Sequence, residues 1–170
     1  MHDLAVRLAR GDEAAFAELY DACADRLHHY VAARFGSHDL ASDVVQTTFL
    51  RAVKSRRRFR RVENPVAYLF QIARNEAVRA TRRTAPSPLP ASELYAAAGD
   101  VHGQQEDAEI VAAALGRLAV DDRELVELKV FGGLTFREIA DVTGLPQGTV
   151  ASRYRRALES LRNWLTKQLR

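Results

Sequence analysis

The chain has 170 residues, of which 25 are Lys or Arg and 22 are Asp or Glu, so its formal net charge is +3. Hydrophobic residues make up 47% of it, enough to bury a core, which excludes a disordered chain. The single cysteine, Cys23, excludes an intrachain disulfide and a cysteine-rich zinc site. No apolar run reaches the roughly 18 residues of a membrane helix, and the N-terminus does not read as a signal peptide, so we expect a cytoplasmic protein without membrane insertion.

Charge is segregated along the chain in four blocks. Residues 1–50 carry a net charge of −4, residues 51–83 of +9, residues 84–128 of −7 and residues 129–170 of +5. Two basic blocks separated by an acidic one predict two separate contacts with a polyanion, with acidic surfaces left for another partner. The simpler alternative is a set of solvated helix faces.

The first predicted helix follows Asp12, a plausible N-cap, and carries one apolar stripe at steps of three and four from Phe16 to Phe35. Gly36 is expected to end it, because glycine adopts the left-handed conformation common after a helix. Ser37 or Asp39 can then cap a second helix, which continues to about residue 53.

A short arginine-rich stretch, residues 55–61, follows the second helix. Asn64 and Pro65 then predict the start of a third helix, with asparagine at the N-cap and proline at the first helical position. Its apolar stripe continues to about Arg82.

Composition changes after residue 83, where three prolines occur within residues 86–90. Proline in a helix interior removes a hydrogen bond, so this segment cannot continue the helix. We interpret residues 84–105 as a flexible linker between two helical domains, residues 1–83 and 106–170. The alternative is a long loop inside one domain. The expected fold class is therefore all-α, with two small helical domains.

The second half predicts a helix-turn-helix. Thr135 and Glu138 form a capping box for a short helix, and residues 144–146 make a turn that contains glycine. The last helix, residues 147–170, presents short polar and basic side chains outward, as a recognition helix in the major groove requires. These side chains are Gln147, Thr149, Ser152, Arg153, Arg155 and Arg156. An ordinary helical hairpin with a solvated face is the alternative.

The segment from Arg51 to Asn75 combines basic residues, Arg74 among them, with the rings of Phe59, Tyr68 and Phe70. Such a combination is typical of surfaces that bind an unstacked single strand, because cations follow phosphates and rings stack on bases. A polybasic loop for any polyanion, or solvated arginine, explains the charge equally well.

Two blocks of sequence resemble the two characteristic regions of bacterial sigma factors of the extracytoplasmic-function (ECF) type, in the sigma-70 family. Residues 43–51 (DVVQTTFLR) and 67–75 (AYLFQIARN) resemble region two, and residues 133–140 (GLTFREIA) and 148–153 (GTVASR) resemble region four. The two blocks occur in the family's order, are separated by a linker, and together span nearly the whole chain. The pair is far more specific than either block alone.

The resemblance implies a promoter-specificity subunit that binds core RNA polymerase, and an anti-sigma factor as a further partner. In the family, the helix that matches residues 43–51 binds the polymerase. The resemblance therefore implies polymerase contacts by Asp43, Gln46, Thr47, Leu50 and Arg51. Capture of the melted minus-ten element is implied for Arg57, Arg58, Phe59, Arg60, Arg61, Asn64, Tyr68 and Asn75. Recognition of the duplex minus-thirty-five element is implied for Thr135, Gln147, Thr149, Ser152, Arg153, Arg155 and Arg156.

Three positions depart from the family pattern. Thr47 stands where the family usually has glutamate, and Tyr68 stands where it commonly has tryptophan. Ala151 replaces a lysine or arginine of the recognition helix, which removes a DNA contact that Arg155 or Arg156 can replace.

The sequence shows no phosphate-binding glycine loop, nucleophile elbow or paired carboxylates in a catalytic setting, so we expect no enzyme, cofactor or metal. Cys23 lies on an apolar stripe and is expected in the core, and Trp164 is expected to pack the last helix. A helix-turn-helix regulator that does not recruit polymerase is the runner-up, distinguished by the first block, which such a regulator does not need. A nucleic-acid enzyme is the third hypothesis.

Overall fold

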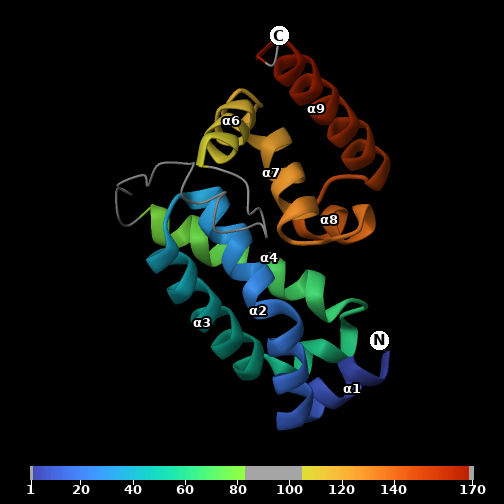
Figure 1. The fold of residues 1–170 in the computed structure, drawn as a ribbon. Helices are drawn as coiled ribbons and strands as arrows, with labels where there is room; N and C mark the ends of the chain where they lie inside the picture. Colours follow the sequence, from blue (N-terminus) through green and yellow to red (C-terminus); the bar gives the residue numbers. More distant parts are fainter. Residues whose placement is uncertain (1, 83–104, 169–170) are drawn as a thin grey trace.

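The computed structural model describes residues 2–82 and 105–168, and among them it contains helices and no strand (Figure 1). The all-α prediction is confirmed. The predicted linker, residues 84–105, lies outside the described residues except at its last position. The elements are α1 (His2–Arg10), α2 (Glu13–Phe35), α3 (His38–Lys54), the 3-10 helix η1 (Arg56–Arg61), α4 (Pro65–Thr81), α6 (Gln105–Gly116), α7 (Val120–Val130), α8 (Phe136–Thr143) and α9 (Gln147–Gln168).

Capping residues begin and end the helices of the first half largely where the sequence predicts. The Asp12 side chain accepts a hydrogen bond from the Ala15 amide at 3.2 Å, and Gly36 ends α2 in the left-handed conformation, with φ of 72°. Ser37, not Asp39, caps α3. Asn64 caps α4 through two backbone amides, with proline at the start of the helix. These short-range signals are therefore sufficient to set the helix boundaries.

The sequence prediction missed α1, because it began the first helix after Gly11. A nine-residue segment is shorter than the window of about 11 residues or more over which helical periodicity is read. Its apolar side chains nevertheless lie in the core, where Leu8 is fully buried and Ala5 and Ala9 are nearly so. Gly11, with φ of 84°, makes the turn into α2.

The helix-turn-helix is present as predicted. The Thr135 side chain accepts a hydrogen bond from the Glu138 amide, and the Glu138 carboxylate accepts one from the Thr135 amide, completing the capping box of α8. Gly144 ends α8 with φ of 74°. Helix α9 then packs on α7 and α8. Val150 of α9 is buried, but Leu158 is 39% exposed, so this helix is only partly covered.

The two halves of the chain pack on one another, with α1–α4 in the lower part of Figure 1 and α6–α9 in the upper part. One hydrophobic core continues from Leu8 of α1 through Phe70 of α4 to Val150 of α9. Helix α8 contacts α4, and α7 contacts α2. The contact brings residues from both halves into the sites described below. No helix among the described residues is long and apolar enough to span a bilayer.

Candidate nucleic-acid interface

The side chains with implied polymerase contacts all belong to α3. Asp43, Gln46 and Leu50 are exposed, and Thr47 is half-buried. Leu50 is 54% exposed, which is unusual for a large aliphatic side chain that has a core available to it. Arg51 Nη1 lies 2.9 Å from Glu76 Oε1 of α4, so its guanidinium is turned toward the first half's own surface.

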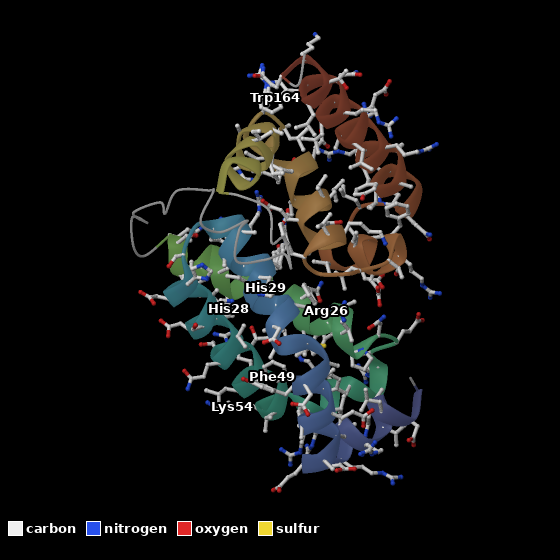
Figure 2. The ribbon with its side chains drawn as sticks, in the orientation of Figure 1. Arg26, His28, His29, Phe49, Lys54 and Trp164 are labelled. Carbon is white, nitrogen blue, oxygen red and sulfur yellow. The ribbon has the colours of Figure 1, made fainter. Side chains whose placement is uncertain are left out.

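An apolar groove of about 530 Å³ lies beside these residues, between α2 and α3. Tyr20 and Phe49 meet across it with their ring centroids 4.8 Å apart, and Val53 extends it at 44% exposure. Phe49 and Lys54 are labelled at this side of the molecule in Figure 2. The sequence alone does not assign Tyr20, Phe49 or Val53 to this surface, because helical periodicity does not indicate which apolar residues stay uncovered.

The arginine-rich stretch forms η1, and Arg57, Arg58, Arg60 and Arg61 are all exposed there. Phe59 is different. Its side chain is fully buried, with its ring 6.0 Å from that of Phe16 and 5.4 Å from that of Tyr68, both edge-on. The implied stacking of Phe59 on a base does not fit this position, because the ring belongs to the core.

A polar cavity of about 430 Å³ opens next to η1, between α3 and α4. Tyr68, Asn75 and Arg58 line it, three of the residues implied to capture the melted strand. Gln71 also lines it and is exposed, although the sequence reasoning did not select it. Phe70, the third ring of the basic stretch, is fully buried and takes no part. The cavity thus combines one ring, two amides and cationic groups with the carboxylate of Glu76, which is paired with Arg51 and Arg79.

Asn64 connects the two halves. While its Oδ1 accepts hydrogen bonds from the Val66 and Ala67 amides, its Nδ2 donates to Glu138 Oε1 of α8 at 2.5 Å. Burial raises the pKa of Glu138, but hydrogen bonds from Thr135 and Asn64 outweigh it and hold that pKa below its usual value. Both the oxygen and the nitrogen of the Asn64 side-chain amide are therefore bonded inside the chain.

A buried carboxylate also joins the halves. Glu124 of α7 accepts two hydrogen bonds from Arg74, at 2.8 and 3.1 Å, and one from the Tyr30 hydroxyl at 2.9 Å. Arg34 Nε lies 3.7 Å from the same carboxylate. Burial opposes the charge, yet the two arginines and the tyrosine keep the pKa of Glu124 below its usual value, while burial raises that of Tyr30. The guanidinium of Arg74 is thus paired with a carboxylate of the second half of the chain.

A second arginine of α2 strengthens this contact. Arg26 donates to the Gly132 carbonyl from its Nε at 2.8 Å and from Nη2 as well. The carbonyl lies in the turn after α7, and Figure 2 labels Arg26 where the lower and upper helices meet. These pairs cannot be inferred from the sequence, because every partner comes from the distant half of the chain.

The outward side of α9 is open near its N-terminus. Gln147, Arg155 and Arg156 are exposed, and Thr149 and Ser152 are half-exposed. Two other residues of the implied set make contacts within the protein. Thr135 caps α8. Arg153 Nε lies 2.6 Å from Asp122 Oδ1 of α7.

Family profiles match both halves of the chain. That of sigma-70 region 2 matches residues 19–86, and that of sigma-70 region 4 matches residues 108–161. The chain is 36% identical over 167 residues to the ECF RNA polymerase sigma factor RpoE of Cereibacter sphaeroides, an alignment that covers 91% of this chain and 88% of that protein. It is 31% identical over 163 residues to the RNA polymerase sigma factor CarQ of Myxococcus xanthus, covering 94% of each.

Solved structures give the same assignment. The fold resembles CnrH, solved in complex with the cytosolic domain of CnrY, with a TM-score of 0.74, 27% identity and coverage of 98% of this chain and 97% of that one. It also resembles the sigma factor RpoE of Bartonella quintana, solved with the anti-sigma factor NepR, with a TM-score of 0.67, 26% identity and coverage of 89% and 96%. The chain belongs to the sigma-70 family and is an RNA polymerase sigma factor of the ECF type. The match to region 2 disfavours a helix-turn-helix regulator that does not recruit polymerase.

Proposed function

We propose that three surfaces of this chain divide the work of promoter-specific transcription initiation. The α3 face binds core RNA polymerase, the cavity beside η1 captures the melted minus-ten strand, and the N-terminal part of α9 reads the minus-thirty-five duplex. The observation that carries the proposal is the exposed apolar groove beside Leu50, which lies on the same helix as the implied polymerase contacts.

The groove fits a helical element of the polymerase clamp. Leu50, Val53 and Tyr20 are 54%, 44% and 49% exposed, and their burial against a partner helix would contribute about 25 cal/mol per Å² of apolar surface covered. Asp43 and Gln46 supply polar contacts at the same face. Thr47 replaces the family's usual glutamate there, so one charged contact is absent from this interface.

Capture of the minus-ten strand is assigned to Tyr68, Asn75, Arg58 and the exposed arginines of η1. Tyr68 supplies a ring for a flipped base, Asn75 supplies hydrogen bonds to the base edge, and the arginines follow the phosphates. Phe59 is not assigned a base contact, because its ring is buried.

Recognition of the minus-thirty-five duplex is assigned to the exposed and half-exposed side chains at the start of α9. Thr149 and Ser152 are short enough to approach base edges, and Arg155 and Arg156 reach phosphates. Arg153 is assigned the role of orienting α9 on α7, since its guanidinium pairs with Asp122.

The same groove is the proposed contact for an anti-sigma factor, which would block the polymerase by competing for it. The RpoE of Bartonella quintana was solved with the anti-sigma factor NepR, and CnrH was solved with the cytosolic domain of CnrY. A sigma factor acts where the polymerase acts, so we assign the chain to the cytoplasm and to a non-enzymatic role.

The proposal is tested by a pull-down with core polymerase. Leu50→Glu places a charge in the apolar groove and should abolish binding, whereas Val111→Glu, at an exposed apolar position of α6, should leave it unchanged. Equal binding by wild type and Leu50→Glu would contradict the assignment of the groove.

A further inference from the structure

Helix α1 lies outside the match to sigma-70 region 2, which begins at residue 19. It nevertheless packs against η1, the segment assigned to the melted strand, and the two lie next to each other at the lower end of Figure 1. Leu8 of α1 and Phe59 of η1 are both fully buried and belong to the same core. The N-terminal helix and the arginine-rich segment therefore form one packed unit, although α2 and α3 separate them in sequence.

Few interactions within η1 stabilise its conformation. It has six residues, of which five are arginines, and none is acidic. The hydrogen bonds of a 3-10 helix are poorly aligned, and neighbouring like charges repel. Phe59 is its buried side chain, and the ring supports Tyr68 edge-on at 5.4 Å. The positions of the arginines and of Tyr68 thus depend on the packing around Phe59.

Helix α1 has its own anchors. At nine residues it is shorter than the roughly 12–15 that an isolated helix needs, so it requires tertiary contacts. Arg7 supplies two of them to the start of α2, with Nε 2.9 Å from Asp12 Oδ2 and Nη1 3.0 Å from Glu18 Oε2. These pairs fix α1 to α2 and leave its apolar face for η1.

The turn after α1 also touches η1. The Arg56 side chain lies over Gly11, so close that a Cβ at this glycine would come within 3.1 Å of Arg56 Nε. Gly11 has φ of 84°, which other residues rarely adopt. The first residue of η1 therefore packs against the turn that follows α1.

We propose that α1 is a positioning element for capture of the minus-ten strand. Leu8, packed in the same core as Phe59, holds η1 and Tyr68 in the geometry that the melted strand requires, without touching DNA itself. The inference rests on the proposed function of η1 and extends it to a helix outside the region 2 match.

The test compares Leu8→Ala with Leu27→Ala in the full chain, at a temperature where circular dichroism shows both folded. Both leucines are fully buried, so both truncations leave a cavity and lower stability, but Leu27 lies in the middle of α2. Only Leu8→Ala should make the η1 arginines more sensitive to trypsin, because cleavage requires local unfolding. In holoenzyme on a promoter that the wild type transcribes, it should also lower permanganate reactivity of the melted strand about tenfold, with duplex binding retained.

Two outcomes overturn the proposal. One is equal behaviour of Leu8→Ala and Leu27→Ala in both assays, and the other is increased trypsin cleavage with normal promoter melting. If Leu8→Ala does not fold, Gly11→Ala replaces it, with Gly144→Ala as control in the trypsin assay alone, since both glycines have positive φ but nothing lies within 4 Å of a Cβ at Gly144. Failure of the wild type to bind core polymerase would overturn the proposed function instead, whereas the trypsin comparison would still decide whether α1 supports η1.

Discussion

Glu124 illustrates how a single buried side chain links the two halves of this sigma factor. It accepts hydrogen bonds from Arg74 and Tyr30 and lies near Arg34, with little exposure to solvent. Glu124→Ala should lower the free energy of unfolding by about 3 to 5 kcal/mol, because it leaves buried cationic and hydroxyl groups without their partner. Urea denaturation measures this loss.

An exposed ion pair provides the control for that variant. Arg137 and Glu63 also join the halves, at 2.6 Å, but their side chains are 71% and 82% exposed. Arg137→Ala should change the free energy of unfolding by no more than about 0.5 kcal/mol, because solvent screens such pairs. Similar losses for both variants would contradict the importance assigned to burial.

The thiol of Cys23 is predicted to be unreactive in the folded chain. It is fully buried, and burial raises its pKa to about 11, so very little thiolate forms near neutral pH. Alkylation by iodoacetamide at mildly alkaline pH should be more than about 100-fold slower in the native protein than in urea. Equal rates in the two states would show that the core around α2 opens freely.

At the level of elements, the side-chain amide of Asn64 supports the contact of α4 with α8. Asn64→Asp keeps a good N-cap for α4 but removes the donor to Glu138 and sets two carboxylates against each other. Far-UV circular dichroism should remain unchanged, while the free energy of unfolding falls by about 1 to 2 kcal/mol.

A double variant tests whether this loss arises between the two side chains. Glu138→Gln supplies an amide that can donate to the new aspartate, and glutamine also serves in a capping box. The double variant Asn64→Asp with Glu138→Gln should recover at least half of the loss. An equal cost of Asn64→Asp in both backgrounds would place its effect elsewhere.

The sequence predicts those elements whose signals are local. The capping side chains of α2, α3, α4 and α8 act within three residues, so the helix boundaries and the helix-turn-helix follow from the sequence alone. Helix α1 was missed, because nine residues are too few for helical periodicity to be read over the usual window and so short a helix depends on tertiary packing.

The candidate site was predicted in part, because a residue's exposure depends on distant segments. Phe59 reads as a ring available for stacking, but Phe16 and Tyr68 from other helices enclose it. Arg153 reads as a DNA contact, but Asp122 of α7 holds it. Both side chains are chemically suited to DNA, and tertiary contacts decide against their direct use in this conformation.

Over the whole molecule, acid should weaken the contact between the halves. The pKa values of Glu124 and Glu138 are both held below their usual value of 4.5. Their contribution to stability is therefore complete above that value and is lost as pH falls through the lowered pKa values. Small-angle scattering should show a larger radius of gyration at about pH 3 than at neutral pH.

The same titration on Glu124→Gln identifies the responsible group. This variant cannot lose a carboxylate charge at residue 124, so its expansion should depend less steeply on pH. An unchanged acid transition in the variant would assign the effect to other carboxylates.

This sigma factor is proposed to direct core RNA polymerase to promoters through surfaces in both of its halves. In vitro transcription with purified core polymerase on a set of promoter fragments tests this most directly. Transcripts from specific start sites are expected only when the chain is added, and they should be lost when Leu50→Glu replaces the wild type. Absence of any transcript together with absence of binding to core polymerase would contradict it.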